Sequence, residues 1–112
     1  MWVIDIRHWL DELQIGPAVP RLRFKVKKLC EIIRYATSKT AGIPISAPPK
    51  CWRKPDRKPC EGVLQINLEP TTDQIFWTCP RCRDEGVVTG WNGLIWDMLD
   101  NASEGQSETQ WR

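Results

Sequence analysis

Four of the five cysteines stand in two groups that could together bind a metal ion. Eight residues separate Cys51 from Cys60, whereas two residues separate Cys79 from Cys82. The two-residue gap is that of a zinc knuckle, a loop that presents two thiolates to one metal ion. Zinc takes four ligands at the corners of a tetrahedron, so we expect one structural Zn²⁺ bound by all four cysteines. The first gap exceeds the usual gap of about two to four residues, which makes the pattern less specific than two knuckles.

The same residues argue against catalysis. Four thiolates close the coordination shell, whereas a catalytic zinc keeps one position open for water or substrate. The only histidine, His8, lies far along the chain from the cysteines, and the sequence has no Ser-His-Asp arrangement and no glycine-rich phosphate loop. Asp84 and Glu85 adjoin the knuckle and are interpreted as a solvated charge pair. We therefore expect no enzyme. Two alternatives to zinc stay open: iron in a four-thiolate site, and a redox dithiol formed by Cys79 and Cys82.

The segment between the two cysteine groups has the pattern of a β-hairpin. Residues 63–69 alternate apolar and polar side chains, which is typical of a half-buried strand. Residues 70–73 have the composition of a turn, and residues 75–78 are β-branched or aromatic, as in a returning strand. A third strand is expected at residues 86–89, which gives a three-stranded antiparallel zinc ribbon. Its small core is expected to contain Leu64, Ile66, Leu68, Trp77, Trp91 and Trp96.

The residues before the cysteines predict mainly helix. Residues 2–4 are apolar and predict a short strand, and Asp5 is placed to cap a helix that continues to Leu13. Residues 20–38 have the clearest helical pattern, with one continuous apolar stripe. This stripe consists of Leu22, Val26, Leu29, Cys30, Ile33 and Ala36. Cys30 is thus expected to be a buried free thiol that behaves as a small hydrophobe.

The net charge of +2 conceals a strong asymmetry along the chain. Residues 20–60 carry twelve Lys and Arg against two acidic residues, whereas residues 61–112 carry three Lys and Arg against nine acidic residues. A basic surface of this kind favours an anionic partner, and we expect nucleic acid to bind a basic helix and a basic loop. The candidate residues are Arg21, Arg23, Lys25, Lys27 and Lys28 on the helix, and Arg53, Lys54, Arg57 and Lys58 in the loop.

Two other interpretations of these charges stay open. The long cations could cover the apolar edges of a core helix, and those of the loop could stabilise a four-thiolate zinc site, whose formal charge is about −2. Alternatively, the basic helix packs against the acidic half of its own or another chain, so that the chain is a protein-interaction or dimer-forming module. Phe24 and Tyr35 lie opposite the apolar stripe and fit a helix that is buried on two sides.

The fold expected from these patterns is α+β. Proline and glycine in residues 41–50 indicate an extended linker. We expect an N-terminal helical part at residues 1–48, a zinc-ribbon-like module at residues 49–100 and a disordered tail at residues 101–112. No stretch approaches the roughly 20 apolar residues of a membrane span, and no secretory signal is apparent, so a reducing cytoplasm is expected.

Several short motifs resemble those of a family of small uncharacterised bacterial proteins. They are Asp-Ile-Arg-His-Trp-Leu-Asp at 5–11, Arg-Lys-Pro-Cys at 57–60 followed by Glu-Gly, Cys-Pro-Arg-Cys at 79–82, and Gly-Trp with a later Trp-Asp at 90–97. The resemblance extends to about residue 97 and implies a cytoplasmic bacterial protein, but it implies no activity. Residues 51–82 also resemble a zinc ribbon, and such ribbons often occur in transcription, translation and mobile-element proteins.

Overall fold

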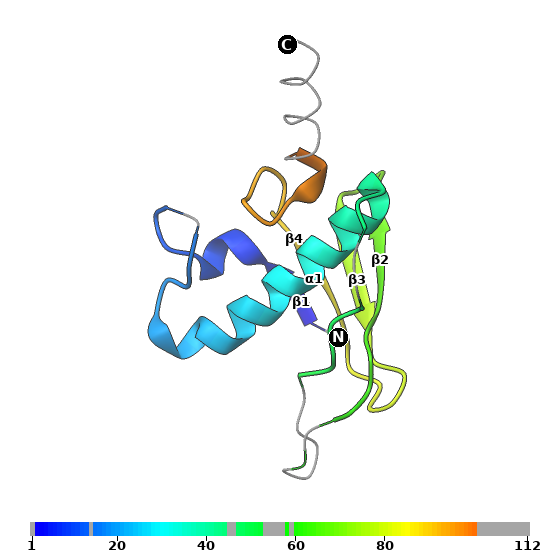
Figure 1. The fold of residues 1–112 in the computed structure, drawn as a ribbon. Helices are drawn as coiled ribbons and strands as arrows, with labels where there is room; N and C mark the ends of the chain where they lie inside the picture. The colour runs from blue at the N-terminus through cyan, green and yellow to red at the C-terminus, as the bar shows by residue number, and fades with distance from the viewer. Residues whose placement is uncertain (1, 14, 45–46, 53–57, 59, 101–112) are drawn as a thin grey trace.

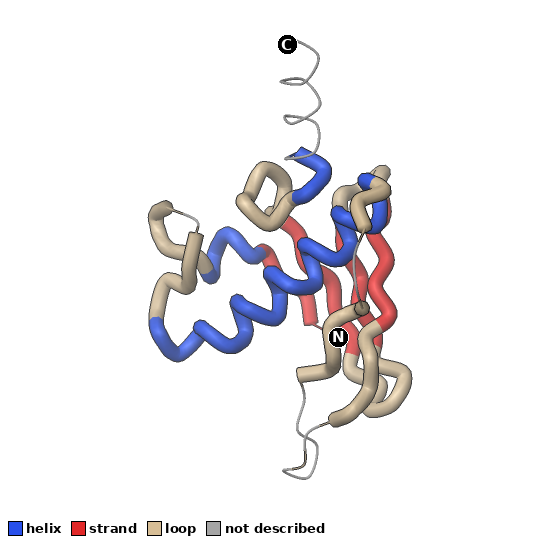
Figure 2. The backbone as a smooth tube through the Cα atoms, viewed as in Figure 1, coloured by secondary structure: helices blue, strands red, loops and turns tan. Residues whose placement is uncertain are grey.

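In the computed structural model, one long helix lies across one face of a β-sheet (Figure 1). The structure describes residues 2–13, 15–44, 47–52, 58 and 60–100. The elements in chain order are the strand β1 (Trp2–Asp5), the 3₁₀ turns η1 (Ile6–Trp9) and η2 (Pro20–Leu22), the helix α1 (Arg23–Ala41), and the strands β2 (Gln65–Glu69), β3 (Gln74–Thr78) and β4 (Glu85–Thr89). The helix contacts β2 and β3, and Figure 2 shows it crossing the strands on one side. The predicted α+β class is therefore confirmed.

The sheet has four strands in the order β1-β4-β3-β2. The neighbours β2, β3 and β4 are antiparallel, but β1 pairs parallel to β4, with Trp2 opposite Gly86 and Asp5 opposite Thr89. The predicted three-stranded antiparallel ribbon is therefore wrong, because the sheet is mixed. The outer edge of β4 offers backbone groups that need partners, and the apolar start of the chain supplies a strand that satisfies them and buries Ile4.

The buried side of α1 is wider than the predicted stripe. The helix begins at Arg23, after the 3₁₀ turn Pro20–Leu22, and continues to Ala41. Its buried residues are Val26, Leu29, Cys30, Ile32, Ile33, Ala36, Thr37 and Ser38. Ile32 lies outside the predicted stripe and is buried because the helix covers two strands and needs a broader apolar face. Phe24, by contrast, is 52% exposed.

Trp77 is fully buried and anchors the core of the sheet. It stands opposite Gly86 of β4, where a Cβ atom would lie 2.3 Å from Cζ2 of the indole. Only glycine at this position leaves room for the large ring. Of the other predicted core residues, Leu64, Ile66 and Trp91 are buried, and Leu68 and Trp96 are partly buried against the same core.

Thr37 fixes the segment that follows the sheet against the helix. Its hydroxyl donates to the carbonyl of Ile33 (2.8 Å) and accepts a hydrogen bond from the backbone N–H of Met98 (3.0 Å). The carbonyl oxygen of Trp96 lies 3.3 Å from the same hydroxyl. Trp96 is thereby held beside α1.

The helix predicted between Asp5 and Leu13 is reduced to the 3₁₀ turn Ile6–Trp9. Asp5 caps this turn as expected, because its carboxylate accepts a backbone hydrogen bond. Leu13, which was expected on the buried face, is 75% exposed. The prediction fails because Leu10 forms an isolated β-bridge with Pro17, which turns the chain back before a second helical turn can form.

The predicted division between residues 48 and 49 stays a prediction, although the sheet combines strands from both sides of it. The predicted tail at residues 101–112 lies outside the described residues. Among the described residues, no helix is long and apolar enough to cross a membrane.

Candidate metal centre

A short antiparallel contact brings Cys51 and Cys60 to the same place. The backbone N–H of Cys51 donates to the carbonyl of Gly62 (2.9 Å), and the N–H of Leu64 donates to the carbonyl of Pro49 (3.0 Å). Residues 49–51 therefore lie beside residues 62–64, and this pairing places the thiols of Cys51 and Cys60 close together. This pairing compensates for the unusually wide gap between the two cysteines.

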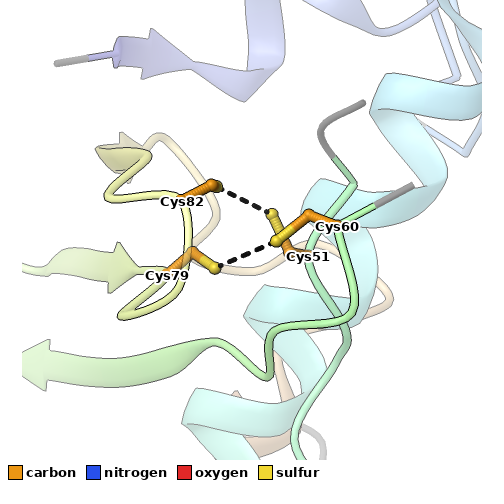
Figure 3. Close-up of side chains that lie close together, drawn as sticks. All are labelled: Cys51, Cys60, Cys79 and Cys82. Atoms are coloured by element: carbon orange, nitrogen blue, oxygen red, sulfur yellow. Dashed lines mark hydrogen bonds between the residues drawn. The ribbon is translucent and has the colours of Figure 1, made fainter. Parts of the chain in front are cut away.

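Cys79 and Cys82 lie in a tight turn that follows β3. The N–H of Arg83 donates to the carbonyl of Cys79 (2.8 Å), and the N–H of Cys79 donates to the carbonyl of Asp84 (2.7 Å). These two hydrogen bonds reverse the chain within a few residues. As Figure 3 shows, the turn directs both thiols toward the other cysteine pair.

All four Sγ atoms lie within 4.8 Å of one another. The Sγ atoms of Cys51 and Cys82 are 3.5 Å apart, and those of Cys60 and Cys79 are 3.6 Å apart (Figure 3). None of these four cysteines forms a disulfide bond. With Zn–S bonds of about 2.3 Å, sulfurs at the corners of a tetrahedron would stand ~3.8 Å apart. The cluster could therefore hold one metal ion of this kind.

The turn also favours ionised sulfur at one position. Burial by itself raises the pKa of the Cys79 thiol, but the backbone N–H groups of Cys82 and Arg81 and the neighbouring thiols outweigh it, so the pKa falls to about 7. Burial raises the pKa of Cys82, against the opposing effect of the backbone N–H of Asp84. One thiol is thus ready to ionise near neutral pH, whereas a cation would have to displace the proton from the other.

Gly62 leaves the space into which the sulfurs fit. Its backbone N–H donates to Sγ of Cys60 at 3.4 Å. A Cβ atom at this position would lie 2.5 Å from Sγ of Cys79 and 3.0 Å from Cβ of Arg81. Any larger residue would therefore displace the sulfur or the loop that carries it.

Asp84 joins the cysteine turn to two tryptophans from distant parts of the chain. Its carboxylate accepts hydrogen bonds from the indole N–H groups of Trp2 and Trp52, each 3.2 Å long. The ring centroids of Trp52 and Trp77 are 6.1 Å apart in an edge-to-face arrangement, and Nζ of Lys25 lies 5.5 Å from the ring centroid of Trp2. The interpretation of Asp84 as a solvated charge is therefore wrong, because it connects β1 and the cysteine turn.

We expect Asp84→Asn to lower the free energy of unfolding by about 1.5 to 3 kcal/mol, the usual contribution of a hydrogen bond to a charged group. The amide would keep one acceptor oxygen but would place an NH₂ group against the second indole N–H. Urea denaturation followed by tryptophan fluorescence measures the change. Glu85→Gln is the matched control, since Glu85 is exposed. Equal stability of the two variants would show that the indole contacts contribute nothing.

The predicted nucleic-acid-binding residues differ in how exposed their side chains are in the structure. Those that are exposed are Arg21, Arg23, Lys25, Lys27 and Lys58. Lys28 is partly buried, and its Nζ lies 3.5 Å from a carboxylate oxygen of Glu31. Arg53, Lys54 and Arg57 lie outside the described residues.

Cys30 and His8 lie outside the cysteine cluster. Cys30 is buried in α1, and burial raises the pKa of its thiol to about 12, so it stays neutral. His8 is exposed, and its Nε2 lies 3.7 Å from the carboxylate of Asp5.

Sequence reasoning missed the roles of two residues at this centre, Gly62 and Asp84. Gly62 stands two residues after Cys60, and a glycine so close to a ligand could have indicated a close approach of the backbone to sulfur. Asp84 gave no such signal, because its partners are Trp2 and Trp52.

Comparison of the chain with protein-family models, with curated proteins and with solved structures found no match.

Proposed function

We propose that the chain is a binding module rather than an enzyme, stabilised by one structural Zn²⁺ on Cys51, Cys60, Cys79 and Cys82. The observation that carries this proposal is the approach of all four sulfurs to within 4.8 Å. A set of four thiolates suits zinc or iron among the common metals, and it leaves no position for water or substrate. The metal would hold the end of the hairpin against the segment that contains Cys51.

Metal analysis of the purified protein tests this proposal. We expect one zinc per chain by elemental analysis and native mass spectrometry. Replacement with Co²⁺ is expected to give the visible absorption of a tetrahedral thiolate site. A protein that purifies with iron would exclude zinc as the resident metal, and one with no metal and a reversible Cys79–Cys82 disulfide would favour the redox dithiol.

The affinity for zinc is expected to fall as the pH is lowered. The pKa of Cys79 is depressed to about 7, so this thiolate exists without metal above that pH and is lost below it. The pKa of Cys82 is raised, so zinc must displace a proton there at neutral pH. Because each such proton weakens binding by about tenfold per pH unit, we expect a decrease of more than a thousandfold from about pH 8 to pH 6. Competition with a chelator at each pH measures it, and a constant affinity would mean that thiolates are not the ligands.

We further propose that this module binds nucleic acid through α1. Support comes from the exposure of Arg23, Lys25 and Lys27 on α1 and of Arg21 in the turn η2 before it. Lys25 also lies over Trp2, whose ring is 6.2 Å from that of Trp52, so this cation adjoins the start of the predicted basic loop. Cations along such a surface would replace the counterions of a phosphate backbone.

The nucleic-acid proposal predicts a steep dependence on salt. Fluorescence anisotropy with labelled DNA and RNA should show binding that weakens between about 50 and 200 mM salt, with a slope that falls by about one for each phosphate contact removed. Absent or salt-insensitive binding would refute it.

The alternative is a protein-interaction or dimer-forming module, and exposed Phe24 on the helix is the observation that favours it. The oligomeric state measured by analytical ultracentrifugation separates the two candidates. A dimer that dissociates when Phe24 is replaced by Ser would support the alternative.

A further inference from the structure

A groove of about 450 Å³ lies beside the N-terminal half of α1, away from the cysteine cluster. In Figure 1 the blue chain before α1 and the orange segment after β4 flank the helix here. Its apolar lining includes Ile15, Pro17, Val26, Cys30 and Trp96. Since Thr37 holds the backbone of Trp96, this wall is fixed to the helix. The volume is within the range of about 300 to 1,000 Å³ that is usual for small-ligand sites.

Three cations, Arg23, Lys27 and Arg34, line the same groove. None of them forms an ion pair with another residue in the described part of the chain. They stand at positions i, i+4 and i+11 of α1, so the row extends over about 16 Å along the helix axis. The one acidic residue in the lining, Glu31, is paired with Lys28, which offsets its charge.

We propose that this groove binds single-stranded nucleic acid, with backbone phosphates along Arg23, Lys27 and Arg34 and one unpaired base against the apolar wall at Trp96. The inference deepens the proposed nucleic-acid function and rests on it. A row of cations about 16 Å long exceeds the reach of one phosphate, so it would contact several successive phosphates of a strand. An aromatic and apolar wall next to cations is typical of single-strand sites, because only unpaired bases can leave the stack to cover it.

The cations that line the groove differ from those predicted from the sequence to bind nucleic acid. Arg34 belongs to the site although it was not among the predicted residues. Lys28, which was, pairs with Glu31 and does not line the groove. Lys27 and Lys28 are therefore adjacent residues of equal charge with different expected roles.

Binding of a labelled 12-nucleotide strand to the zinc-loaded full chain tests the proposal, with the same strand in a duplex for comparison. We expect the single strand to bind about tenfold more tightly than the duplex.

Lys27→Gln and Arg34→Gln should each weaken single-strand binding by about fivefold and lower the salt slope by about 0.7. Lys39→Gln, at an exposed cation of α1 that does not line the groove, should change the affinity by less than about twofold. Trp96→Leu should weaken binding by about tenfold, whereas Trp96→Phe should retain most of it. Zinc content and thermal unfolding of each variant verify that it is folded.

Several results would overturn the groove assignment. Equal binding of duplex and single strand, or equal effects of Lys27→Gln and Lys39→Gln, would leave nucleic-acid binding in place but move it elsewhere on α1. A mononucleotide that competes as well as the strand would make this a nucleotide site rather than a strand site. If poly-glutamate binds in a way that depends on Lys27 and nucleic acid does not, the groove is a binding site for an acidic protein. If neither strand nor duplex binds the unmodified protein, both the inference and the proposed nucleic-acid function fail, whereas the zinc proposal does not depend on the outcome.

Discussion

Replacing Cys79 by Ala is expected to remove zinc from the protein and to abolish its cooperative unfolding transition. Structural zinc contributes about 10 to 16 kcal/mol of apparent free energy in small domains, which is comparable to the whole stability of a typical protein. Cys79 is fully buried, and its Sγ lies 3.6 Å from that of Cys60, so its loss leaves an incomplete ligand set in the interior. Elemental analysis and thermal denaturation by circular dichroism measure both effects.

Cys30→Ala is the matched control for this experiment. Cys30 is also a buried cysteine, but it lies in α1 and outside the cluster. This variant should keep one zinc and a cooperative transition, although it loses some core packing. Chelation of zinc from the unmodified protein should reproduce the state of the Cys79→Ala variant. If Cys79→Ala retains one zinc and an unchanged melting temperature, the four-thiolate centre is refuted.

Gly62→Ala is expected to lower the affinity for zinc by about a hundredfold or more, an effect comparable to the loss of an important group around a metal site. The added Cβ would lie 2.5 Å from Sγ of Cys79 and 3.4 Å from Sγ of Cys60, and Arg81 closes the third side at 3.0 Å. Cβ of Arg81 is fixed by its own backbone, and rotation of the Cys79 side chain away from the methyl group would move its sulfur out of the cluster. Chelator competition at constant pH measures the change.

Gly16→Ala provides the comparison for Gly62→Ala. The nearest atom to a Cβ at position 16 is a carboxylate oxygen of Asp11 at 3.4 Å, which is much farther than the sulfur contact at position 62. This variant should bind zinc as the unmodified protein does. Equal zinc affinity of the two alanine variants would mean that the sulfurs do not pack against position 62 when the metal is bound.

The hairpin could be predicted because its signal is local. Residues 63–69 alternate in polarity, and in β2 Ile66 is buried between exposed Gln65 and Asn67, as that alternation requires. The four candidate ligands could be named for a related reason, since cysteine spacing needs no knowledge of distant contacts. Their approach depends on a pairing of residues 49–51 with 62–64 that the sequence did not indicate.

The mixed sheet could not be predicted, because its pairing is not local. Trp2 pairs with Gly86, and no feature near either residue specifies the other. The same limitation applies to Asp84, which resembles a surface charge next to Glu85 until Trp2 and Trp52 are brought to it. Patterns along the chain therefore predicted the hairpin and the four thiols. The contacts of Trp2 with Gly86 and with Asp84 join residues far apart in the sequence and are apparent only in the structure.

The parallel pairing of β1 with β4 also affects the order in which the molecule can be assembled. Among the four described strands, Trp2–Asp5 is synthesised first and its partner Glu85–Thr89 is synthesised last. Closing a loop of this length costs entropy that local hairpins do not require, and such long-range contacts slow folding. The hairpin β2–β3, by contrast, can form as soon as it has been synthesised. Trp2–Asp5 must therefore stay unpaired until Glu85–Thr89 has been synthesised, and its pairing completes the sheet.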